Sequence, residues 1–295
     1  MILTDPLSAF PNRPPQRVVS LVPSDTASLF DLGLGDCLVA VTSYCKPPAG
    51  RTAALAVAGG PKNPAVEQIT ALKPDLVIAN REENDRQSIE RLSEAGVPVW
   101  LSFPKTVREA VDHLWSIARL FRCDSAAARV RLLEQSLEWA EMAAQDNQPV
   151  RYFCPIWEDR LETGERWWMT FNEQTYSNDV LRIFNGVNVF AGRERRYPLL
   201  AELGHAAADD AAGRDTRYPR VGVKEIIAAA PEVILLPDEP YSYSHDDVER
   251  LRDIFARTPA GEAGRIYPID GTLITWYGTR IGKALETIPD LFNSR

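Results

Sequence analysis

The chain has 295 residues, of which 45% are hydrophobic and 25% charged, and this balance is typical of a globular protein with a buried core. Its formal net charge of −8 argues against nucleic acid or an anionic membrane as a main partner. No apolar run approaches the ~18 residues that a membrane-spanning helix needs. The N-terminal residues have neither a basic start nor an apolar core. The sequence as it stands therefore predicts a cytoplasmic protein, or a periplasmic or cell-surface protein whose signal peptide was removed.

The residues that could carry chemistry are sparse. Four cysteines lack any CxxC spacing and three histidines lie far apart, so we expect free thiols and no metal site. His113 is expected to be structural. There is no phosphate-binding glycine loop and no nucleophile with an assignable base. We therefore expect no catalytic residues, no intrinsic cofactor and no enzymatic activity.

In chain order, the apolar pattern predicts an α/β protein. Residues 1–16 form a Pro-rich arm. Strands are expected at 17–22, 37–44, 76–80, 97–103, 150–157, 233–237 and 265–270, and helices at 24–34, 66–73, 87–95, 106–121, 126–144, 179–184, 223–230, 248–255 and from 280 onward. Trp115 and Trp139, on the two longest helices, are expected to pack between helices.

The chain contains an internal repeat. Val66–Asn80 (VEQITALKPDLVIAN) aligns without gaps on Val223–Pro237 (VKEIIAAAPEVILLP). Each copy has the pattern of a short amphipathic helix stopped near a proline, followed by a fully buried strand of a parallel sheet. Two such copies predict two α/β lobes, although chance similarity between ordinary α/β units would also produce the match.

The helix beginning at Thr106 is the predicted link between the lobes. Thr106 and Glu109 have the spacing of a capping box, and an apolar face follows at three- and four-residue steps. The predicted organisation is an N-terminal arm, an N-terminal lobe, a backbone helix with a following helix, a C-terminal lobe and a C-terminal segment whose helix packs back, at residues 1–16, 17–103, 104–146, 150–271 and 272–295.

Unusual polar and aromatic residues follow the predicted strands. Ligands of open parallel sheets bind beyond the carboxyl ends of the strands. The candidate ligand-binding residues are Tyr44, Asn80, Glu82, Glu83, Trp168, Asp238, Glu239, Tyr241, Trp276 and Tyr277. If the aromatic and the polar residues of this list face one cleft, the cleft would have aromatic walls and acidic edges. Such a cleft would suit a flat or chelate-like ligand that carries positive or hydrogen-bond-donating groups.

The chain resembles the helical-backbone class of periplasmic binding proteins, which serve ABC importers of cobalamin and ferric siderophores. The phrases RVVSLVPSDTASLFDLGL, AVTSYCKPP, GGPKNPAVEQITALKPDLVIAN, YPRVGVKEIIAAAPEVILLPDEPY and WYGTRIGKAL fall where that family places them. The resemblance implies two Rossmann-like α/β lobes joined by a long rigid backbone helix, with the ligand cleft between the lobes. It also implies a monomer that binds a small molecule such as cobalamin or a metal chelate and that docks on an ABC permease.

Particular residues match or depart from the family pattern. Tyr44 stands where cobalamin-binding relatives have a pocket tyrosine. The family often presents one surface glutamate per lobe to the permease; Glu67 fills the first position, but the second is Lys224, with Glu225 one place along. Ala27, after Thr26, stands where the family usually has a glutamate.

Two functions from different classes remain open at this stage, besides a weaker third option, a regulatory interaction protein that has lost its ligand. The first is a substrate-binding protein of the cobalamin or siderophore-iron importer type. The alternative is a cytosolic protein or enzyme that handles a tetrapyrrole or metal chelate on the same scaffold. The absence of a signal peptide favours the second, and the absence of a catalytic constellation favours the first.

Overall fold

The computed structural model describes residues 1–48, 50 and 55–293, and the chain divides into two compact α/β units. Unit 1 comprises Met1–Ser136 and a returning segment, Trp276–Gly282. Unit 2 comprises Leu137–Thr275 and the chain from Lys283 onward. The chain therefore passes from one unit to the other three times. Among the residues described, no helix is long and apolar enough to cross a membrane.

Unit 1 is built on a six-stranded parallel sheet with the order β1-β8-β7-β2-β3-β4. Its strands, with a small β5–β6 ribbon, are β1 (Ile2–Leu3), β2 (Val18–Ser20), β3 (Leu38–Val41), β4 (Ala56–Val57), β5 (Gly59–Gly60), β6 (Asn63–Pro64), β7 (Leu76–Asn80) and β8 (Val99–Ser102). Its helices are the short 3₁₀ turns η1 (Leu7–Ala9) and η2 (Gly35–Cys37), α1 (Pro23–Asp31), α2 (Val66–Ala71), α3 (Arg86–Glu94), α4 (Val107–Leu120) and the first part of α5 (Asp124–Ala144).

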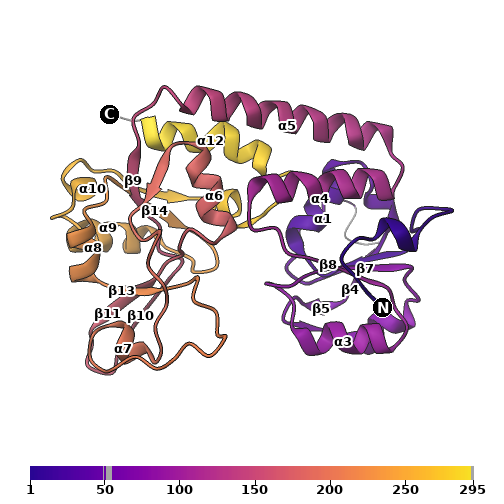
Figure 1. Ribbon diagram of the computed structural model, residues 1–295, viewed down its shortest axis with the longest axis horizontal. Helices are drawn as coiled ribbons and strands as arrows, with labels where there is room; N and C mark the ends of the chain where they lie inside the picture. The colour runs from indigo at the N-terminus through magenta and orange to yellow at the C-terminus, as the bar shows by residue number, and fades with distance from the viewer. Residues whose placement is uncertain (49, 51–54, 294–295) are drawn as a thin grey trace. The chain divides into compact units, whose positions relative to one another are not determined.

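Helices cover both faces of this sheet. Ile69 of α2 and Leu92 of α3 pack with Val19 and Val77 of the strands in one buried cluster. Helices α1 and α4 lie on the opposite face (Figure 1). All five residues of β7 are buried, as expected for a central parallel strand that is covered on both sides. The carboxyl ends of the strands are therefore the edge at which side chains can meet loops and solvent.

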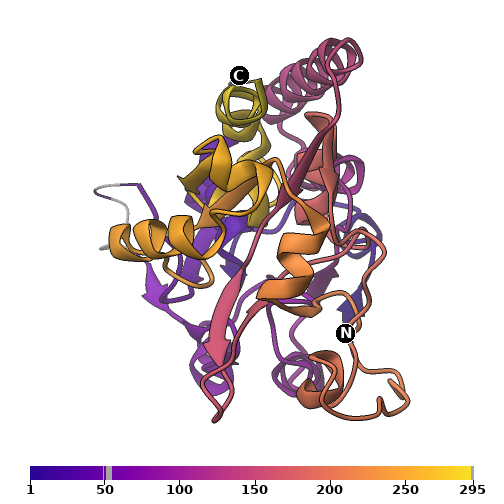
Figure 2. The same cartoon turned by 90° about the vertical axis from the view of Figure 1, so that its left-hand side faces the viewer.

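Unit 2 contains a four-stranded parallel sheet with the order β12-β9-β14-β15 and a three-stranded antiparallel sheet with the order β10-β11-β13. The strands are β9 (Val150–Phe153), β10 (Trp157–Arg160), β11 (Arg166–Met169), β12 (Gly186–Asn188), β13 (Arg220–Gly222), β14 (Val233–Pro237) and β15 (Ile266–Ile269). The helices are α6 (Tyr176–Ile183), α7 (Leu199–Glu202), α8 (Val223–Ala229), α9 (His245–Ile254), α10 (Pro259–Glu262), α11 (Thr272–Thr275) and α12 (Ile281–Asn293). Long loops surround α7 at one end of the unit (Figures 1 and 2).

The internal repeat is a structural repeat. Its two copies become α2 with β7 and α8 with β14, and both strands lie fully buried in parallel sheets. The acids that precede the strands have the same role, because Asp75 accepts the backbone N–H of Arg17 (3.1 Å) and Glu232 accepts that of Arg151 (2.8 Å). Both arginines also donate to the carbonyl that ends the repeat helix, Arg17 to Leu72 and Arg151 to Ala229.

The helix that begins at Thr106 forms as predicted, with both hydrogen bonds of the capping box to Glu109. This helix, α4, lies wholly in unit 1, and the boundary between the units falls inside α5, the second helix of the predicted connecting segment, between Ser136 and Leu137. The apolar residues of α4 are buried, including Val111, Leu114 and Ile117. The predicted Pro-rich arm is also partly structured, because β1 pairs with β8 at the sheet edge.

Candidate functional site

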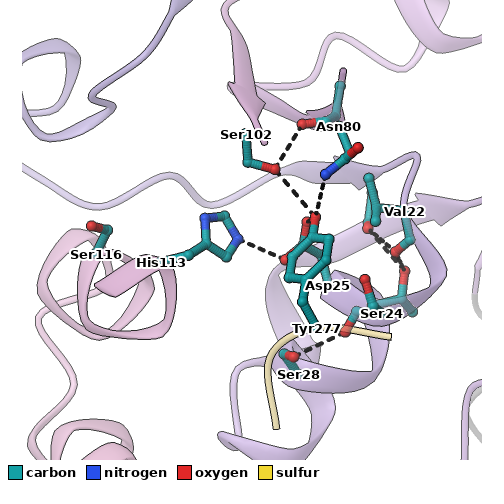
Figure 3. Close-up of polar contacts among 12 residues, drawn as sticks. Val22, Ser24, Asp25, Ser28, Asn80, Ser102, His113, Ser116 and Tyr277 are labelled. Carbon is teal, nitrogen blue, oxygen red and sulfur yellow. Dashed lines mark hydrogen bonds and ion pairs between the residues drawn. The ribbon is translucent and has the colours of Figure 1, made fainter. Parts of the chain in front are cut away.

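A buried polar cluster lies in unit 1, next to the carboxyl ends of β7 and β8 (Figure 3). Its centre is Asp25, which is completely buried in the first turn of α1. One carboxyl oxygen lies 2.7 Å from Nε2 of His113 on α4, and the other accepts a 2.7 Å hydrogen bond from the hydroxyl of Tyr277. Because each of these side chains comes from a different part of the chain, the cluster ties α1, α4 and the returning segment together.

The last residues of two neighbouring strands complete the cluster. The Tyr277 hydroxyl lies 3.2 Å from Ser102 Oγ and 3.3 Å from Asn80 Nδ2. Ser102 ends β8 and Asn80 ends β7, so the parallel register brings them side by side. Burial, and then the nearby Asp25 carboxyl, raise the pKa of Tyr277 well above its usual value. The phenol therefore stays protonated and can donate its hydrogen bond at any physiological pH.

The same cluster fixes the loop that follows β7. The Asn80 side-chain oxygen accepts the backbone N–H groups of Glu82 (2.7 Å) and Glu83 (3.3 Å). Asn84 accepts the backbone N–H of Asn80 at 2.8 Å and donates to the carbonyl of Pro61 at 3.0 Å. The predicted ligand residues Asn80, Glu82 and Glu83 thus belong to one hydrogen-bonded loop. Asn80 itself is buried, and its side chain holds the backbone of Glu82 and Glu83 in place.

Tyr44 and Cys45 follow the end of β3, which β2 separates from β7 in the sheet. The Tyr44 ring is 67% exposed, so it is free to contact a ligand. The Cys45 thiol lies 3.1 Å from Thr26 Oγ1 and 3.2 Å from Thr42 Oγ1. Burial raises the pKa of this thiol, and the charge of Glu83 acts in the same direction. Tyr44, Cys45 and Glu83 therefore belong to one area of the surface of unit 1.

In unit 2, the predicted acids stand at the end of β14. Asp238 accepts the backbone N–H of Gly271 at 2.7 Å, and Glu239 accepts the hydroxyl of Thr275 at 2.9 Å. Tyr241 packs its ring edge-on against Trp157, with centroids 5.6 Å apart. Trp157 is 39% exposed, so this pair presents an aromatic surface at the carboxyl end of the sheet.

Two of the predicted aromatic residues are core residues. Trp168 is completely buried in the main hydrophobic cluster of unit 2, against Phe255, and its indole N–H donates to Glu158 (3.1 Å). The Tyr277 ring is 4% exposed. Neither ring presents a face to solvent, which counts against direct contact with a ligand. Trp276 is only partly buried and remains a candidate.

The structure also shows residues that the sequence analysis missed or placed wrongly. No pattern in the sequence joined Asp25 to Tyr277, which are 252 residues apart. Glu158 of β10 is buried and forms ion pairs with both Arg166 and Arg250, and nothing in the sequence indicated these pairs. The prediction for Trp139 was wrong, because this residue is 70% exposed on α5.

The three predicted docking residues lie on the first turns of the repeat helices. Glu67 is largely exposed on α2, where it pairs with Arg91 of α3. Lys224 is exposed at the matching position of α8. Glu225 is half-exposed and pairs with Arg193 at 2.9 Å.

No group of three or more histidine, cysteine, aspartate or glutamate side chains is placed to hold a metal ion within the described ranges 1–48, 50 and 55–293. The candidate residues are instead aromatic rings, hydrogen-bonding loops and paired acids.

Known proteins share this fold. The family model described as "Periplasmic binding protein" matches residues 18–273. The vitamin B12-binding proteins of Vibrio cholerae and Yersinia pseudotuberculosis are 25% and 27% identical to the chain, over 79% and 80% of it and 74% of each relative.

Solved structures agree with this result at the level of the fold. The periplasmic vitamin B12 binding protein of Vibrio cholerae superposes with a TM-score of 0.73 and 22% identity, covering 95% of this chain and 98% of that one. The periplasmic heme-binding protein RhuT of Roseiflexus superposes with a TM-score of 0.71 and 23% identity, covering 94% and 97%.

Proposed function

Since this chain belongs to the periplasmic binding protein family, we propose that it is the substrate-binding protein of an ABC importer and that its cargo is a corrinoid or another metal chelate. The family match over residues 18–273 carries the first part of the proposal. The vitamin B12-binding relatives support the second part. The ligand is transported cargo and not a cofactor, and the protein works outside the inner membrane, where such an importer collects its substrate.

The accessible candidate residues are consistent with such a cargo. Tyr44 on unit 1 and the Trp157–Tyr241 pair on unit 2 offer aromatic surfaces, which bind flat ring systems with little loss of side-chain entropy. Glu82 and Glu83 follow β7, Asp238 and Glu239 follow β14, and their carboxylates can accept hydrogen bonds from amide or ammonium groups of a ligand.

The test is a binding measurement on the purified protein. Native mass spectrometry will show any cargo that copurifies, and cyanocobalamin and hemin are then titrated while tryptophan fluorescence is followed. We expect one of them to quench the fluorescence, and Tyr241→Ala to weaken its binding by about 1–3 kcal/mol.

Trp139→Ala is the matched control, because it removes an exposed aromatic ring from α5 and should leave the affinity unchanged. If neither probe binds and no cargo copurifies, the chelate proposal fails. If Trp139→Ala weakens binding as much as Tyr241→Ala, the assignment of the contact residues fails.

Docking on a permease is a separate part of the proposal. Glu67 offers a negative charge on one repeat helix, whereas Lys224 offers a positive charge at the matching position. A permease with two paired arginines would attract the first and repel the second, and reversal of a charge changes the sign of that interaction. Lys224→Glu should therefore strengthen binding to such a permease in detergent or nanodiscs. If the wild-type protein and Lys224→Glu bind the permease equally well, a permease with two paired arginines is excluded as the partner.

A further inference from the structure

A hollow of about 420 Å³ lies within the loops of unit 2 between β12 and β13. One wall is the run Gly192–Tyr197, and the other is formed by Asp209, Ala211 and Thr216. The walls are held together by backbone hydrogen bonds, from Arg195 N–H to the Thr216 carbonyl (2.9 Å) and from Asp209 N–H to the Tyr197 carbonyl (2.7 Å). None of the residues that the sequence predicted for ligand binding lines this hollow.

The hollow is rich in arginine although the whole chain is acidic. Arg193, Arg195 and Arg196 line it, against the two acids Glu194 and Asp209. A fourth arginine, Arg214, stands beside it with its guanidinium 3.9 Å from the centre of the Tyr197 ring. The guanidinium of Arg195 lies 4.3 Å from the centre of the same ring. Stacking on an aromatic ring holds the planar guanidinium groups in place without neutralising their charge.

Two of the acids near these arginines pair with an arginine, whereas Glu194 and Asp209 line the hollow itself. Asp215 accepts two hydrogen bonds from Arg217 (3.0 and 2.7 Å); burial raises the pKa of Asp215, but these bonds and the charges of Arg217 and Arg195 lower it overall. Glu225 pairs with Arg193. In the part of the chain that the structure describes, no ion pair joins Arg195, Arg196 or Arg214 to a carboxylate.

Arg195 is also left with an unused donor. Its Nε–H is buried and has no hydrogen-bond partner within the described residues. A buried donor without a partner costs free energy, roughly 1–3 kcal/mol. A second arginine, Arg220, lies close by: its burial, and then the charge of Arg195, lower its pKa. An anion bound in the hollow would reduce the repulsion between these cations.

From this geometry we propose that the hollow of Gly192–Thr216 is a binding site for a small anion with carboxylate or phosphate oxygens. The guanidinium fork binds both kinds of oxyanion through paired N–H groups. The volume falls in the range of pockets that hold small molecules, about 300–1,000 Å³. This anion site is separate from the residues proposed to bind the chelate. It is lined by other residues, and its arginines are positively charged, whereas the proposed chelate-binding residues include acids.

The test uses citrate and inorganic phosphate as separate probes, added to the full-length protein in isothermal titration calorimetry at near-physiological ionic strength. We expect saturable binding of at least one probe. Tighter binding of citrate would indicate a carboxylate ligand, and tighter binding of phosphate would indicate a phosphate ligand. Arg196→Gln should weaken that binding by roughly tenfold. Arg196 is suited to this change because its side chain is exposed, so the substitution does not disturb the fold.

Arg257→Gln is the matched control, since it removes the same charge from another exposed position of unit 2. It should leave the affinity for the probe unchanged. The proposal is overturned if neither probe binds the wild-type protein, or if Arg196→Gln and Arg257→Gln have equal effects. Loss of cyanocobalamin or hemin binding has no bearing on this outcome, so the two proposals can fail separately.

Discussion

The buried hydrogen bonds of Tyr277 provide a quantitative test of the structure. Tyr277→Phe removes one oxygen atom and keeps the ring, which packs edge-on against His113 with centroids 5.6 Å apart. The change deletes a 2.7 Å hydrogen bond to Asp25 and contacts of 3.2 and 3.3 Å to Ser102 and Asn80. All three partners are buried, so water cannot easily replace the lost hydroxyl.

The expected cost follows from these contacts. An intramolecular hydrogen bond contributes about 0.5–1.5 kcal/mol net, and a buried polar group left without its partner costs about 1–3 kcal/mol. Contributions within one network do not add fully. We therefore expect Tyr277→Phe to lower the free energy of unfolding of unit 1 by about 2–3 kcal/mol. At a typical urea slope of about 2 kcal/mol per molar, the midpoint would fall by roughly 1 M.

The assay is urea unfolding followed by circular dichroism, with hydrogen exchange measured by mass spectrometry on peptides that cover β7 and β8. Tyr44→Phe is the matched control, because it removes the same hydroxyl from an exposed ring of the same unit. Exchange should become faster in Tyr277→Phe at the loop after β7, since Asn80 holds the backbone of Glu82 and Glu83. If Tyr277→Phe costs no more than Tyr44→Phe, the buried cluster does not stabilise unit 1 and the reasoning is wrong.

Two further predictions concern individual side chains. The pKa of Cys123 is lowered below its ordinary value of 9.0 by the Ser125 hydroxyl and then by a backbone N–H at the start of α5, whereas burial raises the pKa of the Cys37 thiol to about 12. Iodoacetamide at neutral pH should therefore label Cys123 first, as read by peptide mass spectrometry, and labelling of Cys37 at an equal rate would contradict this. Asp85 caps α3 by accepting the N–H groups of two residues, and Asp85→Ala should cost about 1 kcal/mol at pH 7 in urea unfolding. Because hydrogen bonding by Ser88 lowers the pKa of Asp85 below 3.8, this stabilisation is present above that value and should disappear as the pH falls below it; a difference that stays constant to pH 3 would exclude an ionised cap.

The fold was largely readable from the sequence because it depends on local patterns. The repeat of Val66–Asn80 in Val223–Pro237 showed two helix–strand units, and both have the predicted order and burial. The capping box at Thr106 marked the start of α4 for the same reason, since a cap involves residues only three positions apart. Local patterns do not show what an apolar face packs against, and so the sequence did not tell which of the two helices in the predicted connecting segment 104–146 contains the boundary between the units.

The candidate site was readable only in part. The sequence placed Glu82, Glu83, Asp238 and Glu239 at strand ends, because the ends of buried strands can be recognised from their apolar runs. It could not separate Tyr44, which is exposed, from Trp168, which is buried, because both are aromatic residues near strand ends. Exposure of a side chain depends on which other elements cover it.

The sequence by itself determined the α/β class, the repeated helix–strand units and the residues that end the buried strands, because these follow from periodicity and from caps and turns a few residues long. The tertiary structure alone decided that Asp25, His113 and Tyr277 meet, and that Arg195 and Arg214 stack on one tyrosine ring. Residues 252 positions apart become neighbours only when packing of the sheet and its helices brings the ends of different elements together. The energy that holds such a cluster depends on burial and on hydrogen-bond geometry, and neither quantity exists until the chain has folded.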